Sequence, residues 1–183
     1  MNIDFVVMAH TTRTKYIPSI VEHFDESKIT IDDGTLGVWG NAKQAWNMVD
    51  PKTDYGIVIQ DDALLCDDFK YRAETFISQH NGHFISFYFG HSVKTFKYLR
   101  PQYFDAPLYH AVALAIPTPL IPDMIAYADT RHEIDGDDMK MKRWLISKNM
   151  VCRYSNPSLV QHRNIPSIIN PTKPVRQSAI FKK

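Results

Sequence analysis

Short apolar segments rich in β-branched and aromatic residues alternate along this chain with segments of helical spacing. Six runs have the length and composition of buried strands, and they are residues 3–8, 28–31, 55–60, 84–89, 110–116 and 150–154. The spacing of apolar residues predicts helices between them, at residues 16–24, 43–48, 69–79, 120–128 and 137–147. This alternation predicts an α/β fold whose sheet is mostly parallel and flanked by helices.

The length of the chain suits a single domain, because 183 residues can bury roughly 70% of the surface that the unfolded chain exposes. After Asn156 the sequence contains four prolines and little periodicity. We therefore expect one domain at residues 1–168 and an extended, partly flexible basic tail at residues 169–183.

Composition favours an ordinary globular protein of the cytoplasm. The net charge of +1 gives no overall signature of a polyanion-binding protein, although a local basic patch stays compatible with it. Cys66 and Cys152 lie far apart and form no C-x-x-C motif, which favours a reducing compartment. Residues 1–10 resemble a first strand more than a signal peptide, and no apolar run approaches the ~18 residues that span a bilayer.

The strongest local signal is a pair of acids, Asp61 and Asp62, directly after the apolar run 55–60. Ligand sites of open α/β sheets lie beyond the carboxyl ends of the strands, which is where this pair is expected. Adjacent carboxylates repel each other and need a compensating cation. Mg²⁺ or Mn²⁺ suits such a pair together with phosphate oxygens, whereas the simpler interpretation is that the two acids cap a turn.

Two further candidates lie downstream. His162 follows the last predicted strand and could complete a metal site with Asp62 if the chain folds back, or it could be a structural histidine. Asp137 and Asp138 begin a predicted helix, where they could cap the helix or provide a general base for an acceptor hydroxyl. The spacing does not choose between these two acids.

The polar loop at residues 10–15 could hold a nucleotide, because it follows the first strand and contains Arg13 and Lys15. Asn41, which could also cap the helix that follows it, and Lys43 could reach a diphosphate. The sequence has neither a G-x-x-x-x-G-K-[ST] loop nor a G-x-G-x-x-G fingerprint, which argues against a P-loop nucleotidase and a Rossmann dehydrogenase.

Together these segments resemble the compact GT-A-fold glycosyltransferases that use sugar nucleotides, in particular the small bacterial and phage-type members. The resemblance covers about residues 3–168, and six segments in this order carry it: VVMAHTTR, GNAKQAWNMV, IVIQDDALLCDDF, AVALAIP, DGDDMKMKRWL and PSLVQH. The most specific parts are IVIQDDALLCDDF and PSLVQH. The resemblance implies a GT-A-like, Rossmann-related single domain.

The resemblance also implies roles for individual residues. The family's D-x-D-type motif matches Asp61 and Asp62 without the intervening residue, with Asp62 as the metal ligand and Asp61 nearer the donor ribose. A late histidine that often completes the metal site matches His162, and the base of inverting members matches Asp137 or Asp138. The residues expected to bind the donor are His10, Thr11, Arg13, Asn41, Lys43 and Asp61.

The implied activity is a metal-dependent glycosyltransferase that uses Mn²⁺ or Mg²⁺ and a nucleotide-sugar donor, with a UDP-sugar favoured. Its hydroxyl acceptor could be a hydroxymethylpyrimidine in phage DNA, and the reaction would then take place in the host cytoplasm. A basic skew near the C-terminus would suit phosphate contacts, and it consists of Arg153, Arg163, Lys173, Arg176, Lys182 and Lys183. The alternatives are a nucleotidyltransferase and a non-catalytic nucleic-acid-binding module on a glycosyltransferase-like fold.

Overall fold

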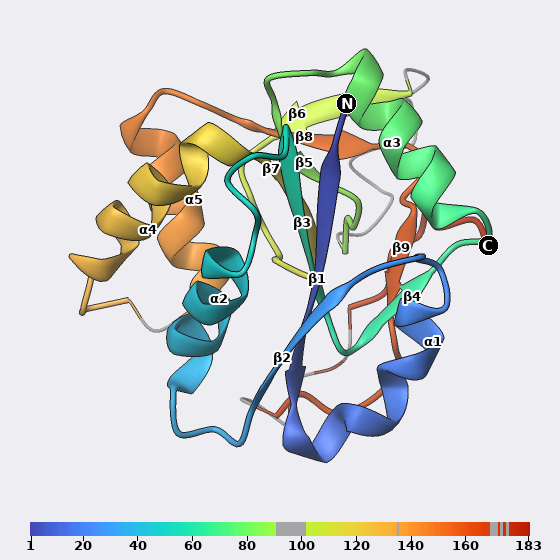
Figure 1. The fold of residues 1–183 in the computed structure, drawn as a ribbon, viewed down its shortest axis with the longest axis horizontal. Coiled ribbons are helices and arrows are strands. Elements are labelled where there is room, and N and C mark those ends of the chain that lie inside the picture. Colours follow the sequence, from blue (N-terminus) through green and yellow to red (C-terminus); the bar gives the residue numbers. More distant parts are fainter. Residues whose placement is uncertain (91–101, 135, 169–171, 173, 175) are drawn as a thin grey trace.

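The structure is a computed structural model, and it describes the chain except for residues 91–101, 135, 169–171, 173 and 175. A seven-stranded sheet forms the centre of the described part (Figure 1). Its strand order is β2-β1-β3-β7-β5-β8-β6. The bounds are β1 Ile3–His10, β2 Lys28–Asp32, β3 Tyr55–Gln60, β5 Phe84–Ser86, β6 Tyr103–Ala106, β7 Ala113–Pro117 and β8 Cys152–Ser155.

The sheet is mixed, and this refines the expected architecture. Strands β2, β1 and β3 are parallel, as are β5 and β8, whereas β7 runs antiparallel to both β3 and β5, and β6 antiparallel to β8. The α/β class is thus confirmed, and parallel pairing holds where β1, β2 and β3 end together. Because the carboxyl ends of these strands meet at one edge, the polar residues after them come together there.

Helices cover both faces of the sheet (Figure 1). On one face lie α2 (Gly37–Asn47), α4 (Ile121–Asp129) and α5 (Asp137–Ser147), and on the other lie α1 (Pro18–Val21) and α3 (Phe69–Gln79). Successive side chains of a strand point to opposite faces. Along β1, therefore, Phe5 and Val7 pack in the core beside α3, and Val6 and Met8 pack in the core beside α2.

A second, two-stranded ladder pairs β4 (Ala63–Leu65) with β9 (Val160–His162) in antiparallel register. Ala63 lies opposite His162 in this ladder. The pairing therefore brings the segment that follows β8 back to the segment that follows β3. A joint site of Asp62 and His162 requires this return of the chain.

Several predicted boundaries were wrong. Helix α2 begins at Gly37, so Asn41 lies inside the helix and does not cap it. Residues 11–16 form a 3-10 helix where a loop was expected, and the helix predicted at 16–24 is only Pro18–Val21. The strand predicted at 84–89 ends at Ser86. Strands β4, β6 and β9 were missed, because runs of three or four residues contain too little alternation to be recognised.

The described part of the C-terminal tail lies against the domain. Ser178 is buried and exchanges hydrogen bonds with Gln161: its N–H donates to Gln161 Oε1 at 2.7 Å, and its carbonyl accepts from Gln161 Nε2 at 3.1 Å. Its hydroxyl lies 2.8 Å from that of Ser158. These contacts attach the tail to β9, and β9 supplies His162.

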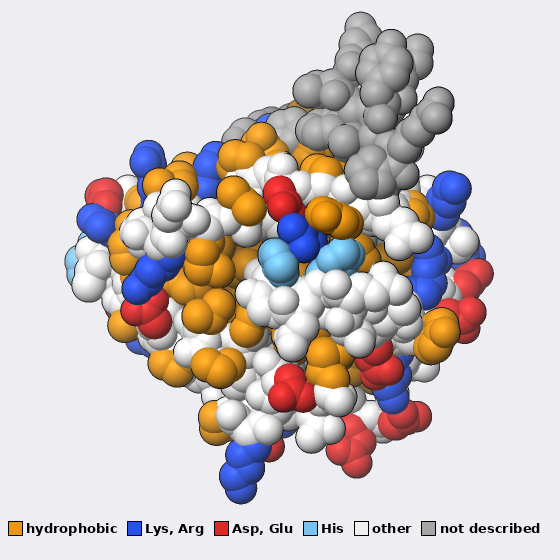
Figure 2. All heavy atoms as spheres, turned by 90° about the horizontal axis from the view of Figure 1, so that it is seen from above, with side chains coloured by type: hydrophobic (Ala, Val, Ile, Leu, Met, Phe, Trp, Pro, Cys, Tyr) orange, Lys and Arg blue, Asp and Glu red, His pale blue; other side chains and the backbone are white. Residues whose placement is uncertain are grey.

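Figure 2 shows the end of the molecule at which β1 and β3 begin, which is opposite to the edge where they end. Positive and negative side chains are interspersed on this end. Among the described residues, no helix is both long enough and apolar enough to cross a membrane.

Candidate active site

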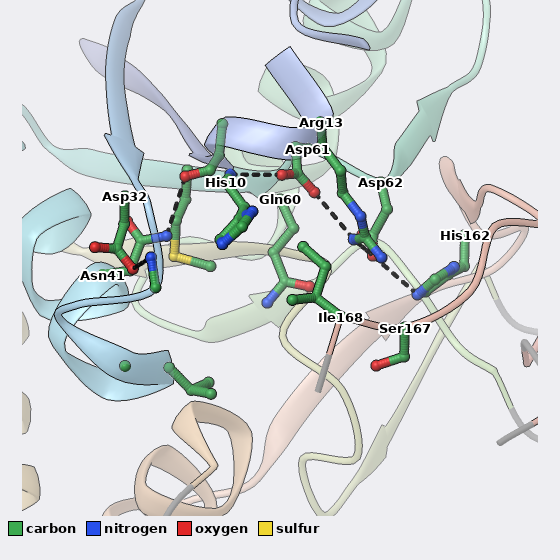
Figure 3. A pocket seen from close by; sticks show the side chains of 15 residues that line it. His10, Arg13, Asp32, Asn41, Gln60, Asp61, Asp62, His162, Ser167 and Ile168 are labelled. Carbon is green, nitrogen blue, oxygen red and sulfur yellow. Dashed lines mark hydrogen bonds and ion pairs between the residues drawn. The ribbon is translucent and has the colours of Figure 1, made fainter. Parts of the chain in front are cut away.

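A pocket of about 340 Å³ lies at the edge where β1, β2 and β3 end. Figure 3 shows Asp32 and Asn41 at one end of it, His10 and Gln60 in the middle, and Arg13, Asp61, Asp62 and His162 at the other end. The lining residues are Met8, Ala9, His10, Arg13, Asp32, Gly34, Gly37, Val38, Asn41, Gln60, Asp61, Asp62, His162, Ser167 and Ile168.

Arg13 joins the two acids that follow β3. Its Nη1 donates to Asp61 Oδ1 at 3.2 Å and to Asp62 Oδ2 at 2.7 Å, and all three side chains are buried. The backbone N–H of His10 donates to Asp61 Oδ2 at 2.7 Å. Burial raises the pKa of Asp61, and the His10 N–H and the guanidinium act against that rise. The turn-capping interpretation of this acid pair does not account for a buried arginine between them.

His162 faces Asp62 with its Nε2 atom, which lies 3.2 Å from Asp62 Oδ2. The other ring nitrogen, Nδ1, lies 2.8 Å from the carbonyl oxygen of Arg163. A carbonyl can only accept, so Nδ1 carries a hydrogen, and in neutral imidazole Nε2 then presents a lone pair to the carboxylate. Two facing acceptors need a proton or a metal ion between them. A backbone carbonyl behind the far nitrogen is also the usual support of a metal-binding histidine.

The residues present fit a hard divalent cation with an incomplete protein shell. Asp62 Oδ1 is buried and has no hydrogen-bond partner in the part of the chain that the structure describes. The carboxylate of Asp62, whose Oδ2 atom faces His162 Nε2, and that nitrogen together offer the oxygen and nitrogen ligands that suit Mn²⁺. The described residues contain no group of three or more metal-binding side chains. Mg²⁺-class ions commonly bind one or two protein ligands and complete their shell with substrate phosphates and water.

Of the other expected donor-binding residues, only some reach the pocket. His10 and Asn41 line it, and Asn41 Nδ2 donates to the carbonyl of Ala9 at 3.2 Å. Thr11 is exposed and lies outside the lining. Lys43 is also outside the lining, because its ammonium pairs with Asp129 of α4 at 2.6 Å.

The helix start that contains Asp137 and Asp138 is connected to the pocket through Gln60, the last residue of β3. Gln60 Nε2 donates to Asp137 Oδ2 at 3.3 Å, and the N–H of Asp138 donates to Asp137 Oδ1 at 2.8 Å. Burial, together with the charge of Asp138, raises the pKa of Asp137 to about 7. Burial also raises the pKa of Asp138, with Lys142 and Arg176 acting against it.

Sequence reasoning missed Gln60, Asp32 and the segment Ser167–Ile168 as pocket residues. Gln60 and Asp32 had a usable signal, since each ends a strand whose carboxyl end lies at this edge. Nothing in the sequence placed Ser167 and Ile168 here, because they follow the unrecognised strand β9.

Asp137→Asn should stabilise the protein at pH 8. The carboxyl has a pKa of about 7 in the fold, above its ordinary 3.8, so the folded state holds its proton more tightly and loses stability as the pH rises through this window. The neutral amide avoids this loss, by about 2 kcal/mol or more at pH 8, with the advantage shrinking towards pH 4. Urea unfolding at both pH values measures it.

Asp33→Asn is the matched control, because Asp33 is exposed and has a lowered pKa. It should give no gain at pH 8. An Asp137→Asn protein no more stable than wild type at pH 8 would show that Asp137 is ionised in the fold without cost.

No protein-family model matches this sequence, and no curated protein matches it either.

Proposed function

We propose that the chain is a metal-dependent glycosyltransferase that moves a sugar from a nucleotide-sugar donor, with a UDP-sugar favoured, to a hydroxyl acceptor. The observation that carries this proposal is the meeting of Asp62, His162 and Arg13 at one end of a pocket at the carboxyl ends of three parallel strands. A GT-A-like fold agrees with this position.

The charges at this end of the pocket explain why a divalent cation belongs to the proposal. Asp61 and Asp62 carry two negative charges and Arg13 one positive charge, so the buried cluster has a net charge of −1 when His162 is neutral. A diphosphate would be repelled by such a cluster. Adding Mn²⁺ or Mg²⁺ changes the sum to +1, which attracts it.

Each residue then has a distinct task in the transfer. A bound cation would act as a Lewis acid on the leaving diphosphate. Asp62 and His162 would hold that cation, and Asp61 fixes the end of β1 through the His10 N–H. The acceptor oxygen forms a bond to the anomeric carbon of the sugar, the bond from that carbon to the diphosphate breaks, and the nucleoside diphosphate leaves.

We assign the base that takes the acceptor proton to Asp138. Asp137 is buried and engaged by Gln60, whereas Asp138 is half-buried and therefore more accessible to an acceptor hydroxyl. A raised pKa suits a base that works near neutral pH. Asp137 instead holds the start of α5 against the pocket wall through Gln60.

We keep a hydroxymethylpyrimidine in DNA as the proposed acceptor. Fewer of the basic residues near the C-terminus can contact phosphate than their number in the sequence suggested. Arg153 is paired with Asp105 at 2.8 Å, and Arg163 donates to the carbonyl of Ala63 at 3.1 Å. Lys173 lies outside the described residues. The exposed candidates for phosphate contacts are Arg176, Lys182 and Lys183.

Phosphorus NMR tests the reaction class directly. Purified protein is incubated with Mg²⁺ and either UDP-sugars or nucleoside triphosphates. The acceptor is DNA containing hydroxymethylcytosine, or water alone as a slow acceptor. Glycosyl transfer releases the nucleoside diphosphate, whereas nucleotidyl transfer from a nucleoside triphosphate releases pyrophosphate. UDP formation supports the proposal. Pyrophosphate release would favour the nucleotidyltransferase, and salt-dependent DNA binding without turnover would favour a non-catalytic module.

A further inference from the structure

Arg13 is a buried cation at the point where a metal ion would bind. Its guanidinium contacts three acceptors: Asp61 Oδ1 at 3.2 Å, Asp62 Oδ2 at 2.7 Å and the carbonyl oxygen of Pro166 at 2.5 Å. Only 8% of its surface is exposed. Figure 3 shows the guanidinium next to Asp61 and Asp62, at the end of the pocket that also holds His162.

The same carboxylate oxygen is shared by Arg13 and by the histidine. Asp62 Oδ2 accepts from Arg13 Nη1 at 2.7 Å and lies 3.2 Å from His162 Nε2. The other oxygen, Oδ1, is enclosed and without a hydrogen-bond partner among the described residues. His162 Nε2 faces Oδ2, so a cation held between Asp62 and His162 approaches the oxygen that Arg13 already contacts. Two positive charges a few ångströms apart in a buried site repel each other strongly.

We propose that Arg13 and a divalent cation exchange at Asp62, so that binding of the cation moves the guanidinium off this carboxylate and towards the donor diphosphate. The inference rests on the proposed metal site and deepens it. It makes Arg13 a positioning residue for Asp62 in one arrangement and a phosphate-binding residue in the other. A planar guanidinium suits both partners, since it binds carboxylate and phosphate with parallel N–H groups.

The exchange also reaches the C-terminal segment. Arg13 Nη2 donates to the carbonyl of Pro166, and the next two residues, Ser167 and Ile168, line the pocket. When the guanidinium moves away from Asp62, its hydrogen bond to the carbonyl of Pro166 shifts as well. Coupling of this kind is reciprocal, so any change that weakens the hold of Arg13 should favour the cation.

The test is the affinity for Mn²⁺ alone, measured by electron paramagnetic resonance on wild type, Arg13→Met, Asp62→Ala and Lys43→Met. Arg13→Met removes the competing charge and should bind Mn²⁺ at least about tenfold more tightly. Lys43→Met is the matched control, because it removes a cation that pairs outside the pocket, and it should bind like wild type. Circular dichroism confirms that each variant is folded.

The outcomes separate this inference from the proposed function. Mn²⁺ binding that Asp62→Ala abolishes and Arg13→Met leaves unchanged or weakens would keep the metal site and overturn the exchange. Binding by Arg13→Met but not by wild type would support the exchange. Absence of binding in both would overturn the exchange together with the metal dependence of the proposed reaction.

Hydrogen exchange gives a second readout, and its main comparison needs only the wild-type protein. In wild type, Mn²⁺ should speed amide exchange at Ser167 and Ile168 as their anchor on Arg13 shifts. The same amides should not respond to Mn²⁺ in Arg13→Met, where that anchor is already lost. Unchanged or slower exchange in wild type with bound Mn²⁺ would contradict the proposal.

Discussion

Asp62→Ala should abolish the stabilisation that UDP and Mn²⁺ together give the wild-type protein. A ligand present at about 100 times its Kd adds ~2.7 kcal/mol to the unfolding free energy, which is several degrees in Tm for a domain of this size. Asp62 is the proposed ligand of the cation and lies 3.2 Å from His162 Nε2, so its loss removes the bridge to the diphosphate. Thermal unfolding with and without UDP and Mn²⁺ measures the effect.

Two comparisons make this result specific. Asp67→Ala removes an exposed carboxylate of the same acidic run outside the pocket, and it should keep the full ligand response. Asp62→Asn preserves the shape and a hydrogen-bond acceptor for Arg13, so it checks that a lost response does not come from an unpaired buried charge. An Asp62→Asn protein with a wild-type Mn²⁺ response would show that the cation binds elsewhere.

Asp138→Asn should lower kcat by about 10²- to 10⁴-fold with little change in donor binding. The amide cannot accept the acceptor proton, while the pocket that holds the nucleotide keeps its residues. In wild type, kcat/KM should rise with pH as Asp138 loses its proton. The midpoint of this rise in kcat/KM should lie above pH 3.8, the ordinary carboxyl pKa, because burial raises the pKa of Asp138. Steady-state rates across pH in wild type and variant measure both effects.

Asp137→Asn is the comparison for the base. Asp137 is assigned to holding α5 against Gln60, and an amide can keep that contact, so this variant should retain most of kcat. A loss confined to Asp137→Asn would transfer the role of base to Asp137. Equal activity of wild type and Asp138→Asn, with the same pH profile, would contradict base catalysis at this helix start and favour a retaining course.

The main strands were predictable because their sequence carries a strong signal. Residues 55–60 form an apolar run, and β3 has these bounds in the structure. The placement of Asp61 and Asp62 at a pocket followed from the rule for strand ends. The direction of β7 was not predictable, because a buried strand has the same composition whether its neighbours run parallel or antiparallel.

From the sequence, a contact between His162 and Asp62 could be predicted only on the condition that the chain folds back. It depends on the pairing of β4 with β9, where Ala63 lies opposite His162. These strands have three residues each and are about 100 positions apart, so neither local pattern nor spacing reveals their register. For a similar reason Lys43 was expected at the pocket, whereas α2 directs it to Asp129, a partner contributed by α4.

The most direct test of the central claim is isothermal titration of wild-type protein with UDP, GDP and CDP, each in excess Mn²⁺ and in excess chelator. The account predicts that UDP binds at one site in Mn²⁺ and at least about tenfold more weakly in chelator, since the acid cluster then repels the diphosphate. Binding of the same strength in both conditions, or no binding of any nucleotide, would contradict it.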